Sequence, residues 1–178
     1  AQAISTNSKS PNIGDEKKVK ELLETDININ IKDDEGYTAL THAVYGGYLK
    51  CVKLLIENGA NINIKDNNGY TALMEAILVA RMGWHNGYIE IVKFLLENGA
   101  DSDIQNNGGS TALIYACKIG NTDIIKLLLE NGANPDIQDK FGRSALIEAS
   151  WPHANQRKNS PGIIKLLIDA GADLDIQE

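Results

Sequence analysis

The sequence predicts an all-α solenoid, in which helix–turn–helix units with β-turn or hairpin tips stack side by side. A first observation is a repeated opening of a hydroxyl residue, alanine and leucine, at residues 38–40, 71–73, 111–113 and 144–146. A second is a repeated ending that contains Gly-Ala, at residues 58–60, 98–100, 131–133 and 170–172. Between opening and ending, apolar residues recur at the three- and four-residue steps of a helix face.

The clearest unit spans residues 110–139. Thr111 is suited to begin a helix, because its hydroxyl can accept a hydrogen bond from the free N–H groups of a helix start. Residues 119–121 break this first helix, and a second, more apolar helix follows, on which we expect Leu127 to be buried. Gly132 ends the second helix where a left-handed residue is favoured, and the segment after it reads as a turn.

A two-helix unit headed by T-P-L-H-x-A, with a period of about 33 residues, is the signature of ankyrin repeats. The stretch TALTHAVYGGYLKCVKLLIENGANINIKD and three further copies resemble this family, from about Gly14 to the end of the chain. Where the family has proline after the opening residue, this chain has Ala39, Ala72, Ala112 and Ala145. Since alanine is a good helix former, the resemblance still implies an ankyrin repeat solenoid.

The register of the copies divides the chain into six segments. We expect residues 1–13 to form a flexible N-terminal tail. Residues 14–33 are expected to form a capping half repeat, because charged residues replace apolar ones on its outer side. Four full repeats follow, at residues 34–66, 67–106, 107–139 and 140–178. The second and fourth are longer, because the link between their helices is extended.

Composition narrows the classes of partner. The chain has 178 residues and a net charge of −7. This charge argues against binding to nucleic acid, which needs clustered lysine and arginine, and against an anionic membrane surface. No apolar run approaches the roughly 20 residues of a transmembrane helix. A hydrophobic fraction of 43% fits a folded domain.

The cysteines and the first residues do not determine the cellular compartment of the protein. Cys51 and Cys117 fall two repeats apart, beyond the ~7 Å reach of a disulfide, so we expect both to be buried as small apolar residues. The sequence begins with Ala1, Gln2 and Ala3, which fit the scar of either signal-peptide cleavage or cloning. A cytoplasmic location is slightly favoured, with secreted and periplasmic locations as alternatives.

Motifs for catalysis are missing from the sequence. It contains no C-x-x-C, H-E-x-x-H, G-x-S-x-G or phosphate loop, and its three histidines have no partner at metal-ligand spacing. The Asp and Asn residues of the turns do not match a calcium loop and are expected to be structural. We therefore predict no enzyme activity, cofactor or metal; a small-molecule pocket between the extended links is a weaker alternative.

Stacking the units aligns the turn tips and the first helices in one extended surface, here called the concave face. The ankyrin resemblance implies that proteins bind there. Tyrosine, tryptophan and arginine are the residues most often found as interface anchors. For Tyr37 and Tyr70 the alternative is packing against the neighbouring tip. The candidate binding residues are Asp34, Glu35, Tyr37, Tyr45, Tyr70, Leu78, Lys118, Phe141, Arg143 and Trp151.

The two extended links form a second candidate surface. Exposed tryptophan is unusual in a link, although insertions at the surface also arise without function. Folding of Trp84 over the helix ends is a further alternative. The residues concerned are Arg81, Met82, Trp84, His85 and His153.

The predicted function is a non-catalytic protein-interaction module that binds a protein partner on the concave face. The alternative is a binding arm of a larger multidomain protein, such as an enzyme, effector or channel. The last repeat keeps the apolar pattern of the interior copies, for example at Ile163 and Leu167. We therefore expect a monomer with weak self-association through that repeat.

Overall fold

A computed structural model describes residues 14–80, 87–151 and 160–175, so the predicted tail of residues 1–13 lies outside it. Within these ranges the chain is helical and has no β-strand, which confirms the predicted fold class; the tips are turns. The helices are α1 (Glu16–Leu23), α2 (Ala39–Tyr45), α3 (Leu49–Glu57), α4 (Ala72–Ala80), α5 (Gly87–Glu97), α6 (Ala112–Ile119), α7 (Thr122–Glu130), α8 (Ala145–Ser150) and α9 (Ser160–Asp169).

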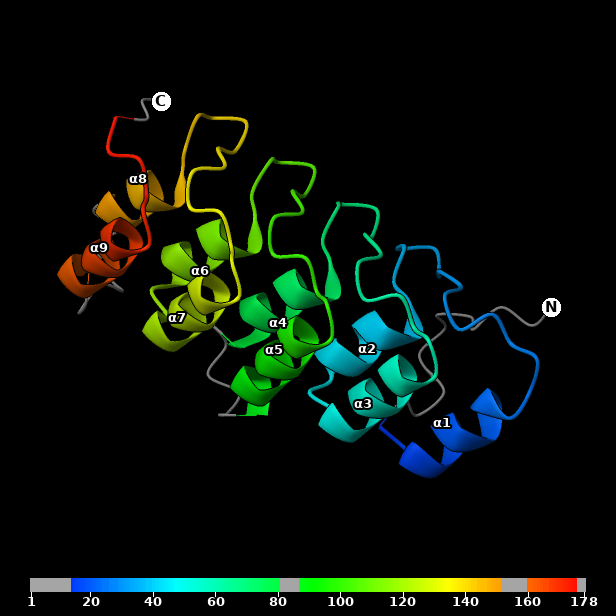
Figure 1. The fold of residues 1–178 in the computed structure, drawn as a ribbon. Helices are drawn as coiled ribbons and strands as arrows, with labels where there is room; N and C mark the ends of the chain where they lie inside the picture. Colours follow the sequence, from blue (N-terminus) through cyan, green and yellow to red (C-terminus); the bar gives the residue numbers. More distant parts are fainter. Residues whose placement is uncertain (1–13, 81–86, 152–159, 176–178) are drawn as a thin grey trace.

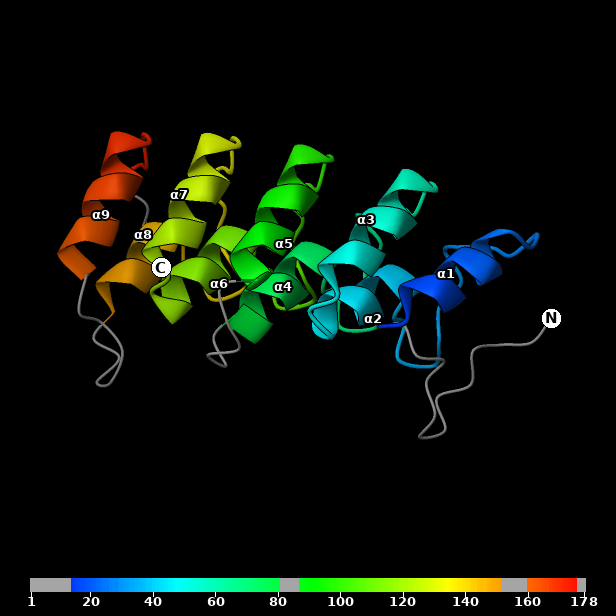
Figure 2. The same cartoon turned by 90° about the horizontal axis from the view of Figure 1, so that it is seen from below.

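The helices stack in two layers (Figure 1, Figure 2). In one layer α2, α4, α6 and α8 pack in sequence, and in the other α1, α3, α5, α7 and α9 do the same. Each helix of the first layer also packs against the helix that follows it in the chain. One continuous apolar core therefore runs along the stack, as expected for a repeat solenoid.

The first helix of every full unit begins at a hydroxyl cap. Each cap side-chain oxygen accepts a hydrogen bond from the backbone N–H three residues later, at 3.3–3.4 Å. The acceptors are Thr38, Thr71, Thr111 and Ser144. The expected cap at Thr111 is confirmed. Gly132, with a φ of 85°, follows α7 in the left-handed conformation that the sequence predicts.

In each full unit the second-layer helix buries one leucine to 3% exposure or less, namely Leu55, Leu95, Leu128 and Leu167. The residue before each of these is only partly buried. The expectation that Leu127 is buried is therefore wrong: Leu128 points into the core. One residue turns the side chain by about 100° around the helix axis, which the apolar run of residues 127–129 could not reveal.

Helix α1 packs against α3 through buried Val19, while Lys17, Lys18 and Glu21 on its other side are exposed. This arrangement fits the capping half repeat proposed for residues 14–33. Cys51 and Cys117 are buried and form no disulfide, as expected.

The loops that end the units are tied to one another by a recurring hydrogen bond. In each case an Asn or Asp side-chain oxygen accepts from a backbone N–H of the next unit, at 2.8–2.9 Å. The acceptors are Asn30, Asn63, Asp103 and Asp136. Stacking is therefore held by a polar seam as well as by the core.

Candidate functional site

Each turn tip is built around one acidic or amide side chain. Its Oδ1 accepts hydrogen bonds from the backbone N–H groups two and four residues later, at 2.7–3.1 Å. These organising residues are Asp33, Asp66, Asn106 and Asp139. The structural role expected for the acidic and amide residues of the turns is confirmed at these positions.

The turn tips lie in a row (Figure 1), and neighbouring tips are joined by hydrogen bonds. Asn67 donates through Nδ2 to the carbonyl of Asp34 at 2.7 Å, and Asn107 donates in the same way to Asn67 at 2.9 Å. Backbone N–H groups add tip-to-tip bonds to the carbonyls of Glu35, Asn68 and Gly108. The tips are thus held at fixed positions before any partner arrives.

In the first and third repeats, the second polar side-chain atom of the organising residue contacts the side chain nine residues later, on the first helix. In the first repeat, Asp33 Oδ2 lies 2.6 Å from His42 Nε2. In the third repeat, Asn106 donates through Nδ2 to the Tyr115 hydroxyl at 2.8 Å. The pairing of His42 was missed from the sequence, because only the fold brings it to Asp33.

In the fourth repeat, Arg143 makes the corresponding link between Asp139 of the tip and Glu148 of the first helix. Arg143 donates to Asp139 Oδ2 from Nε at 3.0 Å and from Nη2 at 2.6 Å. The same guanidinium lies 3.4 Å from Glu148 Oε2. Burial acts to raise the pKa of Asp139, but hydrogen bonds from Arg143 and Phe141 outweigh it and lower that pKa.

The described residues of the second repeat include no such counter-ion. Asp66 and Glu75 are only 7% and 8% exposed, and Asp66 Oδ2 has no hydrogen-bond partner among the described residues. Burial raises the pKa of Glu75 to about 7, and the charge of Asp66 adds to this shift. Tyr70 stands where the fourth repeat has Arg143, and its hydroxyl lies 2.7 Å from that of Tyr115 instead.

Burial of Glu75 makes stability depend on pH. Its pKa of about 7 in the folded chain lies above its usual 4.5, so folding favours the protonated form. We expect the free energy of unfolding to fall as the pH rises from 4.5 to 7. Above pH 7, Glu75 should contribute no further change. Glu75→Gln should remove this part of the pH dependence and stabilise the fold by about 1–2 kcal/mol at alkaline pH.

Urea titrations of wild type and Glu75→Gln, at about pH 5 and about pH 8, measure this effect. Glu57→Gln, at an exposed position of α3, is the matched control and should behave as wild type. A Glu75→Gln variant with the pH dependence of wild type would contradict the assignment.

The structure places several of the predicted binding residues at the surface of the concave face. Tyr45 and Phe141 are 56% and 72% exposed, and Asp34, Glu35 and Lys118 are exposed as well. The guanidinium of Arg143 lies over the Phe141 ring, 5.1 Å from the ring centroid.

Four other predicted residues are less available. Tyr37, Leu78 and Arg143 are partly buried, and Arg143 is engaged by Asp139 and Glu148. Tyr70 packs against the core and bonds to Tyr115. The alternative predicted for Tyr70 is packing against the neighbouring tip; in the structure its hydroxyl pairs with Tyr115 on α6, the first helix of the next repeat.

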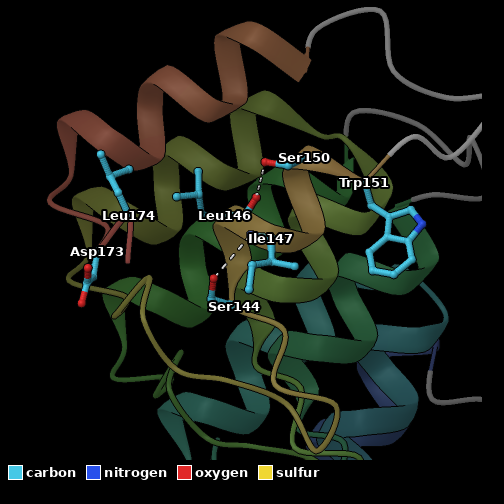
Figure 3. A pocket seen from close by; sticks show the side chains of 7 residues that line it. All are labelled: Ser144, Leu146, Ile147, Ser150, Trp151, Asp173 and Leu174. Carbon is cyan, nitrogen blue, oxygen red and sulfur yellow. Dashed lines mark hydrogen bonds between the residues drawn. The ribbon is translucent and has the colours of Figure 1, made fainter. Parts of the chain in front are cut away.

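Trp151 lies at the end of α8, beside an open hollow of about 390 Å³ (Figure 3). Leu146 and Ile147 in this hollow are partly exposed, whereas the corresponding residues of the third repeat are buried where α8 packs on α6. Leu174, also in the hollow, is 65% exposed. The outer side of the fourth repeat thus presents apolar surface.

The second candidate surface lies outside the described residues: Arg81, Met82, Trp84, His85 and His153. Among the residues that are described, no group of three or more His, Cys, Asp or Glu could hold a metal ion. In the same ranges, no helix is long and apolar enough to cross a bilayer.

Stacked helix–turn–helix units with one shared core define a helical repeat protein. A family model described as "Ankyrin repeats (3 copies)" matches residues 8–82 and 77–178, so the chain belongs to the ankyrin repeat family. Ankyrin repeats are generally protein–protein interaction modules and typically have no catalytic activity. A comparison with curated proteins finds no match.

Proposed function

We propose that this chain is a non-catalytic module that binds a protein partner through the concave face. The observation that carries the proposal is the exposure of two aromatic rings, Tyr45 and Phe141, on that face. Aromatic side chains supply large contact area and are frequent interface anchors. Because hydrogen bonds already hold the tips in place, binding would cost little further ordering of the backbone.

Charge along the face supports an oriented partner. Asp34 and Glu35 make the first tip acidic, and Lys118 and Lys140 supply exposed positive charge further along. Arg143 adds little to this, since Asp139 and Glu148 balance it. A partner with the opposite polarity would therefore bind in one direction.

The test is capture from a lysate with tagged wild-type chain, followed by affinity measurement for each captured protein. The double variant Tyr45→Ala/Phe141→Ala should unfold at nearly the wild-type temperature and bind at least about tenfold more weakly. Ile168→Ala, which removes an exposed apolar side chain of α9, is the matched control. Equal binding by wild type and the double variant would contradict a concave-face site.

The alternative, a binding arm of a larger multidomain protein, rests on the apolar hollow beside α8 (Figure 3). The same surface would support the expected weak self-association. Leu174→Asp in the same capture experiment distinguishes binding at the hollow from binding at the concave face. Loss of binding with Leu174→Asp, but not with Tyr45→Ala/Phe141→Ala, would favour the hollow as the docking surface.

A further inference from the structure

The acidic pair of the second repeat, Asp66 and Glu75, corresponds in position to Asp139 and Glu148 of the fourth repeat, but no described residue supplies its counter-ion. Asp66 Oδ1 accepts from the backbone N–H groups two and four residues later, as Asp139 Oδ1 does. This shared geometry turns Oδ2 of both residues toward the first helix. There, in the fourth repeat, Arg143 joins Asp139 to Glu148.

No side chain of the described residues supplies this charge in the second repeat. Tyr70 replaces the arginine, and its hydroxyl is turned to Tyr115. Asp66 Oδ2 is buried without a partner, and the carboxylate of Glu75 makes no hydrogen bond or ion pair within the described ranges. Burying a carboxylate oxygen without a donor is costly, so a group that supplies donors would be bound favourably.

We propose that Asp66 and Glu75 form a receptor for one guanidinium group, supplied by an arginine of the protein that binds the concave face. This inference rests on the proposed function and names the chemistry of its partner. A planar guanidinium has five donors and can serve two carboxylates at once, as Arg143 does, whereas an ammonium is a single point of charge.

In the fourth repeat, the Arg143 side chain at the corresponding position keeps 24% exposure. Tyr37 of the preceding tip also faces the pair: burial, followed by the charges of Glu75 and Asp66, raises the pKa of its hydroxyl. A proton on Glu75 is the competing occupant, since the pKa of that group is raised to about 7. Guanidinium binding should therefore strengthen as the pH rises through 7.

The probe is argininamide, titrated into the whole chain at about pH 8 and followed by NMR at the side-chain carboxyl groups. We expect saturable shifts at Asp66 and Glu75, and none with citrullinamide, the uncharged analogue of similar shape. Asp66→Asn/Glu75→Gln should weaken binding by about tenfold or more. This variant keeps the turn, because Asn106 accepts the same two backbone bonds in the third repeat. Glu57→Gln is the control and should bind as wild type.

Tyr70→Arg provides a second test by placing the arginine of the fourth repeat in the second. It should lower the pKa of Glu75 by about one unit or more and abolish argininamide binding. Equal shifts with argininamide and citrullinamide, or an unchanged Glu75 pKa in Tyr70→Arg, would each overturn the inference. These measurements need no partner protein. A negative result would therefore overturn the guanidinium receptor alone, and the proposed function would still be tested by the capture experiment with Tyr45→Ala/Phe141→Ala.

Discussion

Leu128→Ala is expected to lower the free energy of unfolding by about 2–5 kcal/mol. Leu128 is fully buried in α7, which packs against α5, α6 and α9. Removing its side chain leaves a cavity that four packed helices cannot easily close, so both the transfer energy and the packing energy are lost. Urea unfolding followed by circular dichroism measures the change as a lower midpoint with an unchanged slope.

Leu127→Ala is the matched control, because it removes the same side chain from the adjacent position, where burial is only partial. It should cost about half as much, in proportion to the apolar area that it exposes. An equal or larger loss in Leu127→Ala would show that α7 is rotated about its axis relative to the structure described.

The sequence was sufficient for the local features of the fold. Thr111 and Gly132 mark a helix start and a helix end through interactions within a few residues, so their roles follow from residue type and spacing. The sequence did not show which side of α7 enters the core. The apolar residues Ile124, Ile125 and 127–129 lie on more than one side of this helix. Packing against the neighbouring helices decides between them.

The candidate site was less predictable, because its polar contacts join residues on different elements. Asp33 pairs with His42 across the turn and the cap, and Tyr70 reaches Tyr115 in the next repeat. Neither distance in sequence corresponds to a known local motif. Comparing the four repeats would have placed Asp66 with Glu75, but only the structure shows that Arg143 supplies a counter-ion in one repeat and that no described residue does in the other.

Exposure of the predicted binding residues likewise depends on neighbours. Tyr45 and Phe141 lie at an exposed helix end and an exposed tip, so they remain uncovered. Tyr70 occupies the tip position that corresponds to Arg143, yet it packs inward because Tyr115 offers a hydroxyl partner. A residue type that favours interfaces therefore indicates a binding position only once its partners within the fold are known.

Gly69→Ala is expected to destabilise the fold by about 3 kcal/mol or more. Gly69 ends the second tip with a φ of 84°, a conformation that costs alanine about 1–2 kcal/mol. A Cβ there would also lie 2.6 Å from the backbone N of Asn107 and 2.7 Å from its Oδ1. The third tip would have to move away, which would break the bonds from Asn107 to the carbonyls of Asn67 and Asn68.

Gly59→Ala separates the cost of the left-handed backbone conformation from the cost of the contact between tips. Gly59 has a φ of 87° but no atom within 4 Å of the position that a Cβ would take. It should cost only the conformational part, about 1–2 kcal/mol. Urea unfolding of the two variants gives the difference, which measures the contact between tips. Equal losses would mean that the tips tolerate separation, and the concave face would then be a series of independent turns. A larger loss for Gly69→Ala would establish that neighbouring tips are coupled, as a preorganised binding face requires.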